Sequence, residues 1–177
     1  MNLPNKLSIA RVLCIPAIAV LLYTGDDTCR IAAAVLFILA SLTDLLDGHI
    51  ARKYNLITDF GKFIDPVADK LLVLTTLVML VRGGLMEAWV VLVILCRELA
   101  VDGLRMVAVG QGKVIAAGKL GKWKTTFQMV TIVVILLFNK ACFATWYTGI
   151  LTGISVALTL WSAVDYFVRN KSVFATK

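Results

Sequence analysis

Long apolar stretches alternate with short polar breaks along the whole chain. A membrane-spanning helix needs about 20 mostly apolar residues. The breaks divide the chain into six segments near that length, which we expect to be helices: 5–24, 30–52, 62–82, 86–108, 120–139 and 143–168. Only the last holds a long charge-free run, from Ala141 to Val164, so the other five must carry charges inside them. The pattern predicts an all-α integral membrane protein with six transmembrane helices.

The composition supports a membrane protein. Apolar residues make up 60% of the 177 residues and charged residues 16%, whereas a soluble domain has about 25% charged residues. This leaves too little polar surface to cover a soluble globule, and it also excludes intrinsic disorder, coiled coil and a disulfide scaffold. The four cysteines are scattered, without metal-ligand spacing, and we interpret them as small core residues. We expect one membrane-embedded domain covering residues 1–177.

The basic residues gather on one side of the predicted helices. The chain has 18 Lys and Arg against 11 Asp and Glu, a net charge of +7. With six crossings, only Arg30, Arg82 and Lys140 fall on one side, and all the others fall on the opposite side. The positive-inside rule then places both termini in the cytoplasm. Cytoplasmic loops and anionic lipid explain the basic excess, so we expect no nucleic-acid partner.

Many charged residues lie inside the inner halves of the predicted helices. They are Asp44, Asp47, Asp65, Asp69, Arg97, Glu98, Asp102, Arg105, Lys122 and Lys124. A charge deep in a membrane costs about 2.5–3.5 kcal/mol even on a lenient insertion scale. These side chains should therefore avoid lipid and line one polar cavity that opens to the cytoplasm.

Acidic and small residues share two helical faces. Asp44, Asp47, Gly48 and Ala51 fall within an arc of about 100°, and Gly61, Asp65 and Asp69 within about 80°. Four converging carboxylates would repel one another unless cations lay between them, and oxygen ligands favour Mg²⁺, Mn²⁺ or Ca²⁺. Two such ions can clamp the attacking and leaving oxygens of phosphoryl transfer. The alternative is a set of solvated helix-end charges that pair with nearby lysines.

The small residues and one arginine suit a bound nucleotide or phosphate. Gly48, Ala51 and Gly61 leave room for a flat ligand against the backbone, and Arg52 can pair with a phosphate. The full pattern is Asp44-x2-Asp47-Gly48-x2-Ala51-Arg52-x8-Gly61-x3-Asp65-x3-Asp69. It resembles the signature of the CDP-alcohol phosphatidyltransferases at every fixed position. That resemblance implies the family's six-helix fold, often a homodimer, and transfer of a phosphatidyl group from CDP-diacylglycerol to an alcohol with release of CMP.

The resemblance also implies roles for individual residues. Two divalent ions, Mg²⁺ or Mn²⁺, would bind Asp44, Asp47 and Asp65, with Asp69 both near a metal and acting as general base. The implied contacts to CDP-diacylglycerol are Asp47, Gly48, Ala51, Arg52, Thr58 and Gly61. The stretch from Pro4 to Arg11 is similar to a family segment beside the nucleotide, which adds Asn5, Ser8 and Arg11. This stretch fits a capped helix start equally well, with Asn5 or Ser8 as the N-cap.

A second cluster, on the inner side of segments 86–108 and 120–139, is basic. Arg97 and Arg105 are eight residues apart and share a helix face, and Lys122 and Lys124 enter from the next helix. Such a cluster suits a dianionic phosphate on the acceptor alcohol, with Glu98 and Asp102 orienting the bases. Ordinary positive-inside charge explains lysines at the helix ends well but explains Arg97 and Arg105 poorly.

The pattern Arg97-Glu98, Gly103-Leu104-Arg105 and Gly121-Lys122-x-Lys124-Thr125-x-x-Gln128 resembles the bacterial phosphatidylglycerophosphate synthases within the family. The resemblance implies glycerol 3-phosphate as acceptor, and an enzyme of the bacterial inner (cytoplasmic) membrane whose active site faces the cytoplasm. Inositol phosphate or phosphatidylglycerol as acceptor remains an alternative. A divalent-cation transporter is the alternative from another class, although the apolar outer halves and the lack of an internal repeat disfavour it.

Overall fold

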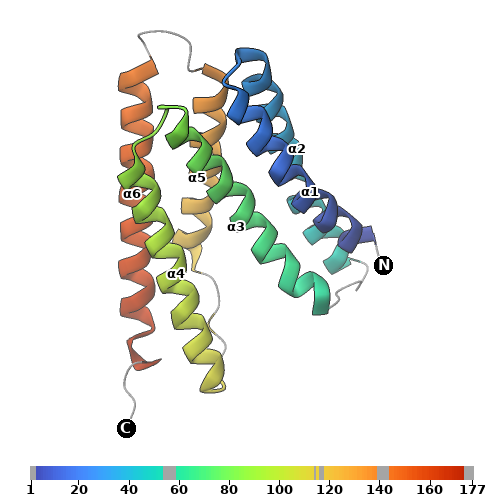
Figure 1. Ribbon diagram of the computed structural model, residues 1–177. Coiled ribbons are helices and arrows are strands. Elements are labelled where there is room, and N and C mark those ends of the chain that lie inside the picture. The colour runs from blue at the N-terminus through green and yellow to red at the C-terminus, as the bar shows by residue number, and fades with distance from the viewer. Residues whose placement is uncertain (1–2, 54–58, 114, 116–117, 139–143, 174–177) are drawn as a thin grey trace. The chain divides into compact units, whose positions relative to one another are not determined.

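The computed structural model describes residues 3–53, 59–113, 115, 118–138 and 144–173; within these ranges, the side chains of 3–6, 44–53, 59–60, 62–63, 119, 144–145 and 172 are not described. The described residues form six α-helices, a short 3-10 helix and no strand (Figure 1). The helices are α1 (Leu3–Thr24), α2 (Asp27–Lys53), α3 (Asp59–Arg82), α4 (Ala88–Gly110), α5 (Lys119–Phe138) and α6 (Ala144–Arg169), followed by η1 (Lys171–Val173). Each predicted helical segment coincides with one of these helices, so the all-α prediction is confirmed.

Three of the breaks between helices contain a glycine in the left-handed conformation. Gly25, Gly84 and Gly112 follow α1, α3 and α4 with φ of 73°, 67° and 71°. After α3, the N–H of Leu85 donates to the carbonyl of Leu80 at 2.9 Å, a bond pattern that closes a helix at a left-handed glycine. These glycines therefore end the helices at the breaks that the sequence pattern predicts.

The chain divides into two compact units. The first comprises residues 1–85 and 132–139, and the second comprises residues 86–131 and 140–177. In the first unit, α1 packs against both α2 and α3. The core of this unit contains small buried residues of α2, namely Ala33, Ala34 and Ala40. It also contains larger ones, such as Phe37 of α2 and Leu72 of α3. Small residues let membrane helices approach closely, so this packing is typical of a membrane bundle.

In the second unit, α4 packs against α6 and η1. Its core contains Val101, Leu104, Ala108, Tyr166 and Val173. A row of buried hydroxyl residues, Ser155, Thr159 and Ser162, follows one face of α6. Thr159 and Ser162 donate to carbonyls of their own helix, at 2.7 and 3.0 Å, so these hydroxyls do not depend on a ligand for hydrogen bonding.

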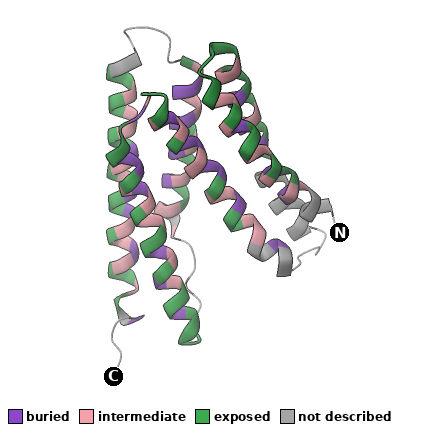
Figure 2. Cartoon of the chain, in the orientation of Figure 1, coloured by how far each residue is buried: buried purple, intermediate pink, exposed green. Residues whose placement is uncertain are grey.

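Large apolar side chains are exposed on all six helices, as expected where lipid covers the surface (Figure 2). Examples are Leu13, Leu39, Val78, Leu92, Val130 and Trp161. Three helices of the described chain are long and apolar enough to cross a membrane by length and composition, over Leu7–Thr24, Leu120–Phe138 and Trp146–Arg169. Crossing by α2, α3 and α4, the orientation of the termini and the cytoplasmic cavity remain predictions.

Candidate active site

The acidic part of the site lies on α3, in the first unit. Asp65 and Asp69 are four residues apart and share one face of this helix with the buried Gly61. Both aspartates are half-buried, and Oδ1 of Asp69 is shielded from solvent. The face predicted from residue spacing is therefore largely turned away from the surface. Carboxylates that are shielded from water in this way need polar or ionic partners.

Asp65 has a partner on another helix. The hydroxyl of Ser8, on α1, donates to Oδ1 of Asp65 at 2.5 Å. Ser8 is buried, with 1% of its surface exposed, and Arg11 is equally buried one turn further along α1. Ser8 and Arg11 are thus both inside the first unit, and Ser8 contacts one of the predicted metal ligands.

Several predicted site residues lie outside the described side chains. Asp44, Asp47, Gly48, Ala51 and Arg52 belong to α2, where only the backbone is described, and the side chains of Asn5 and Thr58 are also outside the description. Among the described residues, no group of three or more acidic, histidine or cysteine side chains gathers. The convergence of four carboxylates from α2 and α3 therefore stays a prediction.

The surroundings of Asp65 fit a divalent cation. Within the described part of the chain, its hydrogen-bond partner is the neutral hydroxyl of Ser8, and no lysine or arginine forms an ion pair with it. A half-buried carboxylate is stabilised by a polar or ionic partner, and a bound cation would provide one. The available ligand atoms on this face of α3 are carboxylate oxygens, the type that Mg²⁺ and Mn²⁺ prefer.

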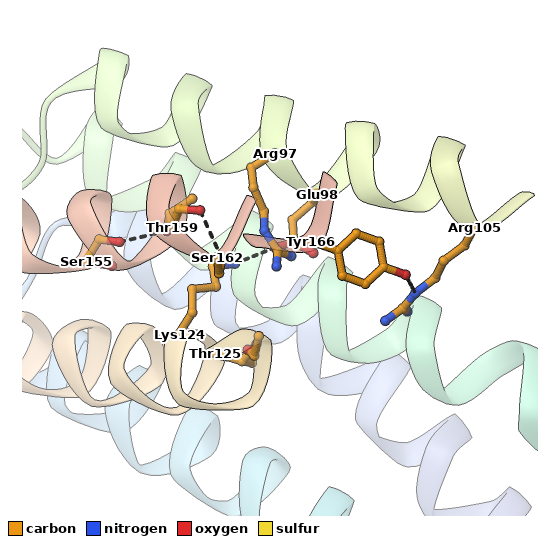
Figure 3. A network of polar contacts seen from close by, with 10 residues as sticks. Arg97, Glu98, Arg105, Lys124, Thr125, Ser155, Thr159, Ser162 and Tyr166 are labelled. Carbon is orange, nitrogen blue, oxygen red and sulfur yellow. Dashed lines mark hydrogen bonds and ion pairs between the residues drawn. The ribbon is translucent and has the colours of Figure 1, made fainter. Parts of the chain in front are cut away.

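The basic part of the site lies in the second unit (Figure 3). Glu98 accepts at Oε1 from Nη1 of Arg97, at 3.1 Å, and from Nζ of Lys124 on α5. All three side chains are shielded from solvent, and Lys124 most, with 3% of its side chain exposed. A Cβ added at Gly121 would lie 3.6 Å from Nη2 of Arg97, an ordinary van der Waals contact, so the guanidinium lies close to the start of α5. Two cations and one anion give this trio a net charge of +1.

Arg105 is held separately by α6. Its Nε donates to the hydroxyl of Tyr166 at 3.0 Å, and its guanidinium carbon lies 5.7 Å from the centre of that ring (Figure 3). Tyr166 is buried and belongs to the core of the second unit. The sequence reasoning missed Tyr166. The available signal was the spacing of Ser155, Thr159, Ser162 and Tyr166, which places a polar row on one face of α6.

The structure does not bring Lys122 into this cluster. Lys122 is exposed, whereas Lys124 is buried, because residues two apart on a helix point to nearly opposite sides. The structure thus brings Arg97 and Lys124 together through Glu98, and it places Arg105 against Tyr166 on the neighbouring helix.

The fold and these side chains define a class of protein: an all-helical membrane protein with carboxylates and cations shielded inside it. Comparison with known proteins identifies the class further. Residues 1–161 match the CDP-alcohol phosphatidyltransferase family, and the chain belongs to that family. Members of this family generally depend on a divalent metal.

The chain is similar to several curated proteins named CDP-diacylglycerol–glycerol-3-phosphate 3-phosphatidyltransferase. It is 42% identical to one from Bacillus subtilis, covering 99% of this chain and 98% of that protein. It is 40% identical to one from Rickettsia typhi, covering 98% of this chain and 99% of that protein. The similarity therefore extends over nearly the full length of both chains.

Proposed function

We propose that this protein transfers the phosphatidyl group of CDP-diacylglycerol to glycerol 3-phosphate, which gives phosphatidylglycerol phosphate and CMP. The observation that supports this most directly is the full-length similarity, at about 40% identity, to proteins named for that reaction. The trio of Arg97, Glu98 and Lys124, which is largely shielded from solvent, agrees with an acceptor that bears a phosphate.

In this proposal Asp69 is the general base. Its carboxylate takes the proton from the sn-1 hydroxyl of glycerol 3-phosphate, and the resulting oxygen attacks the β-phosphorus of CDP-diacylglycerol. A P–O bond forms to the glycerol, the bond to the CMP oxygen breaks, and CMP leaves with that electron pair. The shielding of Asp69 Oδ1 supports this role, because a base kept away from bulk water is protected from side reactions with solvent, such as hydrolysis of the donor.

The metal site would be formed by Asp44, Asp47, Asp65 and Asp69, holding two ions of Mg²⁺ or Mn²⁺. Such ions supply positive charge that stabilises the pyrophosphate and its leaving group. The half-buried Asp65, whose only ionic or hydrogen-bond partner among the described residues is a serine, supports this assignment.

The donor site would use residues of α1, α2 and α3, together with Thr58 from the sequence between α2 and α3. Its members are Asn5, Arg11, Asp47, Gly48, Ala51, Arg52, Thr58 and Gly61. Arg11 and Gly61 are buried, which agrees with a role facing the interior of the unit rather than lipid. Arginine suits this site because its planar guanidinium pairs well with phosphate oxygens.

The acceptor phosphate would bind Arg97, Arg105 and Lys124, with Lys122 as an outlying fourth member. A phosphate dianion would gain charge-assisted hydrogen bonds from these cations. Glu98 holds two of these cations in place, and Tyr166 holds the third.

The cellular setting that we propose combines the charge distribution, which bears on orientation, with the family resemblance, which bears on the membrane and on the dimer. We place both termini and the active site on the cytoplasmic side of a bacterial inner membrane, in a single-domain, six-span chain that forms a homodimer. Membrane placement also explains how one enzyme meets both substrates, because the lipid tails of the donor stay in the bilayer while the nucleotide reaches water.

A direct assay tests the proposed reaction. The purified full-length protein in detergent is given CDP-diacylglycerol, radiolabelled glycerol 3-phosphate and Mg²⁺. We expect label in the lipid fraction, one CMP released for each lipid formed, and no transfer when the metal is chelated. Asp69→Asn should lose turnover while it still binds CDP-diacylglycerol, because a base acts only in the reaction step.

The same assay separates the alternatives. Transfer to inositol phosphate or phosphatidylglycerol in preference to glycerol 3-phosphate would assign a different acceptor. Uptake of divalent cations into proteoliposomes without any CMP release would favour a transporter and would refute the proposed reaction.

A further inference from the structure

We infer that Ser8 is a positioning residue for the metal-binding carboxylate of Asp65, rather than a contact to the nucleotide. The inference rests on the proposed function, because it assigns Asp65 to the metal site. Ser8 and Asp65 are 57 residues apart in sequence and lie on different helices, so the contact depends on the packing of α1 against α3.

The contact is a direct hydrogen bond between side chains of two helices, in which the hydroxyl of Ser8 donates to Oδ1 of Asp65. Ser8 is almost fully buried, so water competes little for its hydroxyl.

The bond controls how Asp65 presents its oxygens. Among the described residues, Ser8 is the only hydrogen-bond or ion-pair partner of Asp65. Its single donated proton engages Oδ1, which leaves Oδ2 and the remaining lone pair of Oδ1 to act as ligands. Without Ser8, the carboxylate would have to be oriented at the moment of metal binding, at an additional entropic cost.

The same bond argues against a direct donor role for Ser8 toward the nucleotide. A serine hydroxyl has one proton, and while it donates to Asp65 it cannot also donate to a phosphate oxygen. Arg11, buried on the same helix one turn away, is the residue of this segment suited to phosphate. Ser8 would thus orient the metal ligand Asp65, while Arg11 would contact the phosphate of the donor.

A metal titration without substrates tests this role. Mn²⁺ binding to the purified full-length protein in detergent is followed by the electron paramagnetic resonance signal of free Mn²⁺. Removing a residue that orients a metal ligand typically costs 10- to 100-fold in metal affinity, so we expect the Mn²⁺ Kd of Ser8→Ala to rise roughly 10-fold or more. Ser8→Thr keeps the hydroxyl and should restore the wild-type Kd.

Two further variants control for loss of packing. Thr76→Val removes another buried hydroxyl of the first unit, one that donates to the carbonyl of Leu72 in its own helix, and should leave the Mn²⁺ Kd unchanged. Ser8→Cys keeps a side chain of similar size with a weaker donor, so it should raise the Kd even if Ser8→Ala proves unstable.

The outcomes separate this role from the proposed function. An unchanged Mn²⁺ Kd in Ser8→Ala and Ser8→Cys, with a raised KM for CDP-diacylglycerol, would overturn the positioning role and assign Ser8 to the nucleotide. A wild-type protein that binds no Mn²⁺ would overturn both the metal site and this role. If Ser8→Ala weakens Mn²⁺ binding but the wild type transfers nothing to glycerol 3-phosphate, the positioning role stands and the proposed reaction fails.

Discussion

At the scale of single residues, three cations of the second unit, the half-buried Arg97 and Arg105 and the buried Lys124, are each held by an oxygen atom of another side chain. Arg97 and Lys124 share the carboxylate of Glu98, while Arg105 donates to the hydroxyl of Tyr166. These contacts hold the cations in place before the phosphate binds. Binding therefore costs less conformational entropy of the side chains. Within the trio of Arg97, Glu98 and Lys124, one anion lies between two cations.

Arg105→Ala should therefore weaken acceptor binding selectively. A hydrogen bond to a charged group contributes about 1.5–3 kcal/mol, so its loss should raise KM for glycerol 3-phosphate roughly 10- to 100-fold. KM for CDP-diacylglycerol should stay nearly constant, and steady-state kinetics with each substrate varied in turn measures both. A rise in the KM of CDP-diacylglycerol alone would move Arg105 to the donor site and remove this support for the acceptor.

Tyr166→Phe tests whether the positioning of Arg105 matters. The variant keeps the ring beneath the guanidinium but removes the hydroxyl that accepts from Nε, a loss of about 1 kcal/mol or roughly a fivefold change. We expect KM for glycerol 3-phosphate to rise by that factor in Tyr166→Phe and not in Tyr147→Phe, which alters a more exposed ring of α6. An equal effect in an Arg105→Ala background would show that the hydroxyl does not act through Arg105.

The sequence could predict which residues share a face but not which partners they meet. Asp65 and Asp69 share a face because of helical periodicity alone, and the structure places both there, half-buried. Ser8 reaches Asp65, and Tyr166 reaches Arg105, only because separate helices pack together. Helical periodicity cannot give such contacts, since they depend on the rotation and offset of each helix against its neighbour.

At the scale of the elements, polar contacts at a helix end determine where the helix begins, and the pattern of apolar residues does not show them. Segment 30–52 was predicted from hydrophobicity, yet α2 begins at Asp27. Asp26 explains the difference, because its Oδ2 accepts from the N–H groups of Thr28 and Cys29, at 3.0 and 3.4 Å, and caps the helix. Arg30 then pairs with Asp27 at 2.8 Å. A polar first turn thus extends the helix beyond its apolar stretch.

Gly84 should be more sensitive to substitution than a glycine inside a helix. Its φ of 67° is costly for any residue with a Cβ, by about 1–2 kcal/mol, although an added Cβ would meet no other atom within 4 Å. Gly84→Ala should therefore lower the thermal midpoint of the detergent-solubilised protein. Gly149→Ala, in the interior of α6 and equally open, should leave the midpoint unchanged or raise it. Equal shifts in the two variants would contradict a backbone origin.

At the scale of the whole molecule, many large apolar side chains are exposed while several polar ones are buried. Ser8, Arg11, Lys124 and Gln128 are buried beside an apolar core, and each of the six helices exposes large apolar side chains. Such exposure is expected when lipid is the solvent. The composition of the chain predicted a membrane protein, whereas length and hydropathy of single helices identify only α1, α5 and α6 as spans among the described residues, because α2, α3 and α4 carry internal charges.

The predicted outer side holds few cations, and two of them have local partners. Arg82 donates to the carbonyl of Tyr23 at 3.0 Å, with its guanidinium carbon 3.7 Å from the centre of that ring, and Arg30 pairs with Asp27. Tyrosine is common at membrane interfaces, so the contact between Arg82 and Tyr23 fits the end of a span. Both arginines are thus accommodated by the protein on the side that the positive-inside rule makes extracytoplasmic.

Cysteine labelling tests the orientation. In a background with the four native cysteines replaced by serine, Glu87→Cys lies between α3 and α4 and Lys113→Cys follows α4; both sites are exposed, and Glu87 makes no side-chain cap. Because α4 would separate them by one crossing, a membrane-impermeant maleimide added to intact cells should label residue 87 only. Residue 113 should react after the cells are opened, and a reporter fused after Lys177 should be cytoplasmic. Labelling of both cysteines in intact cells would show that α4 does not cross the membrane. Labelling of residue 113 alone would show the inverted topology, in which the basic cluster lies away from the cytoplasmic pool of glycerol 3-phosphate.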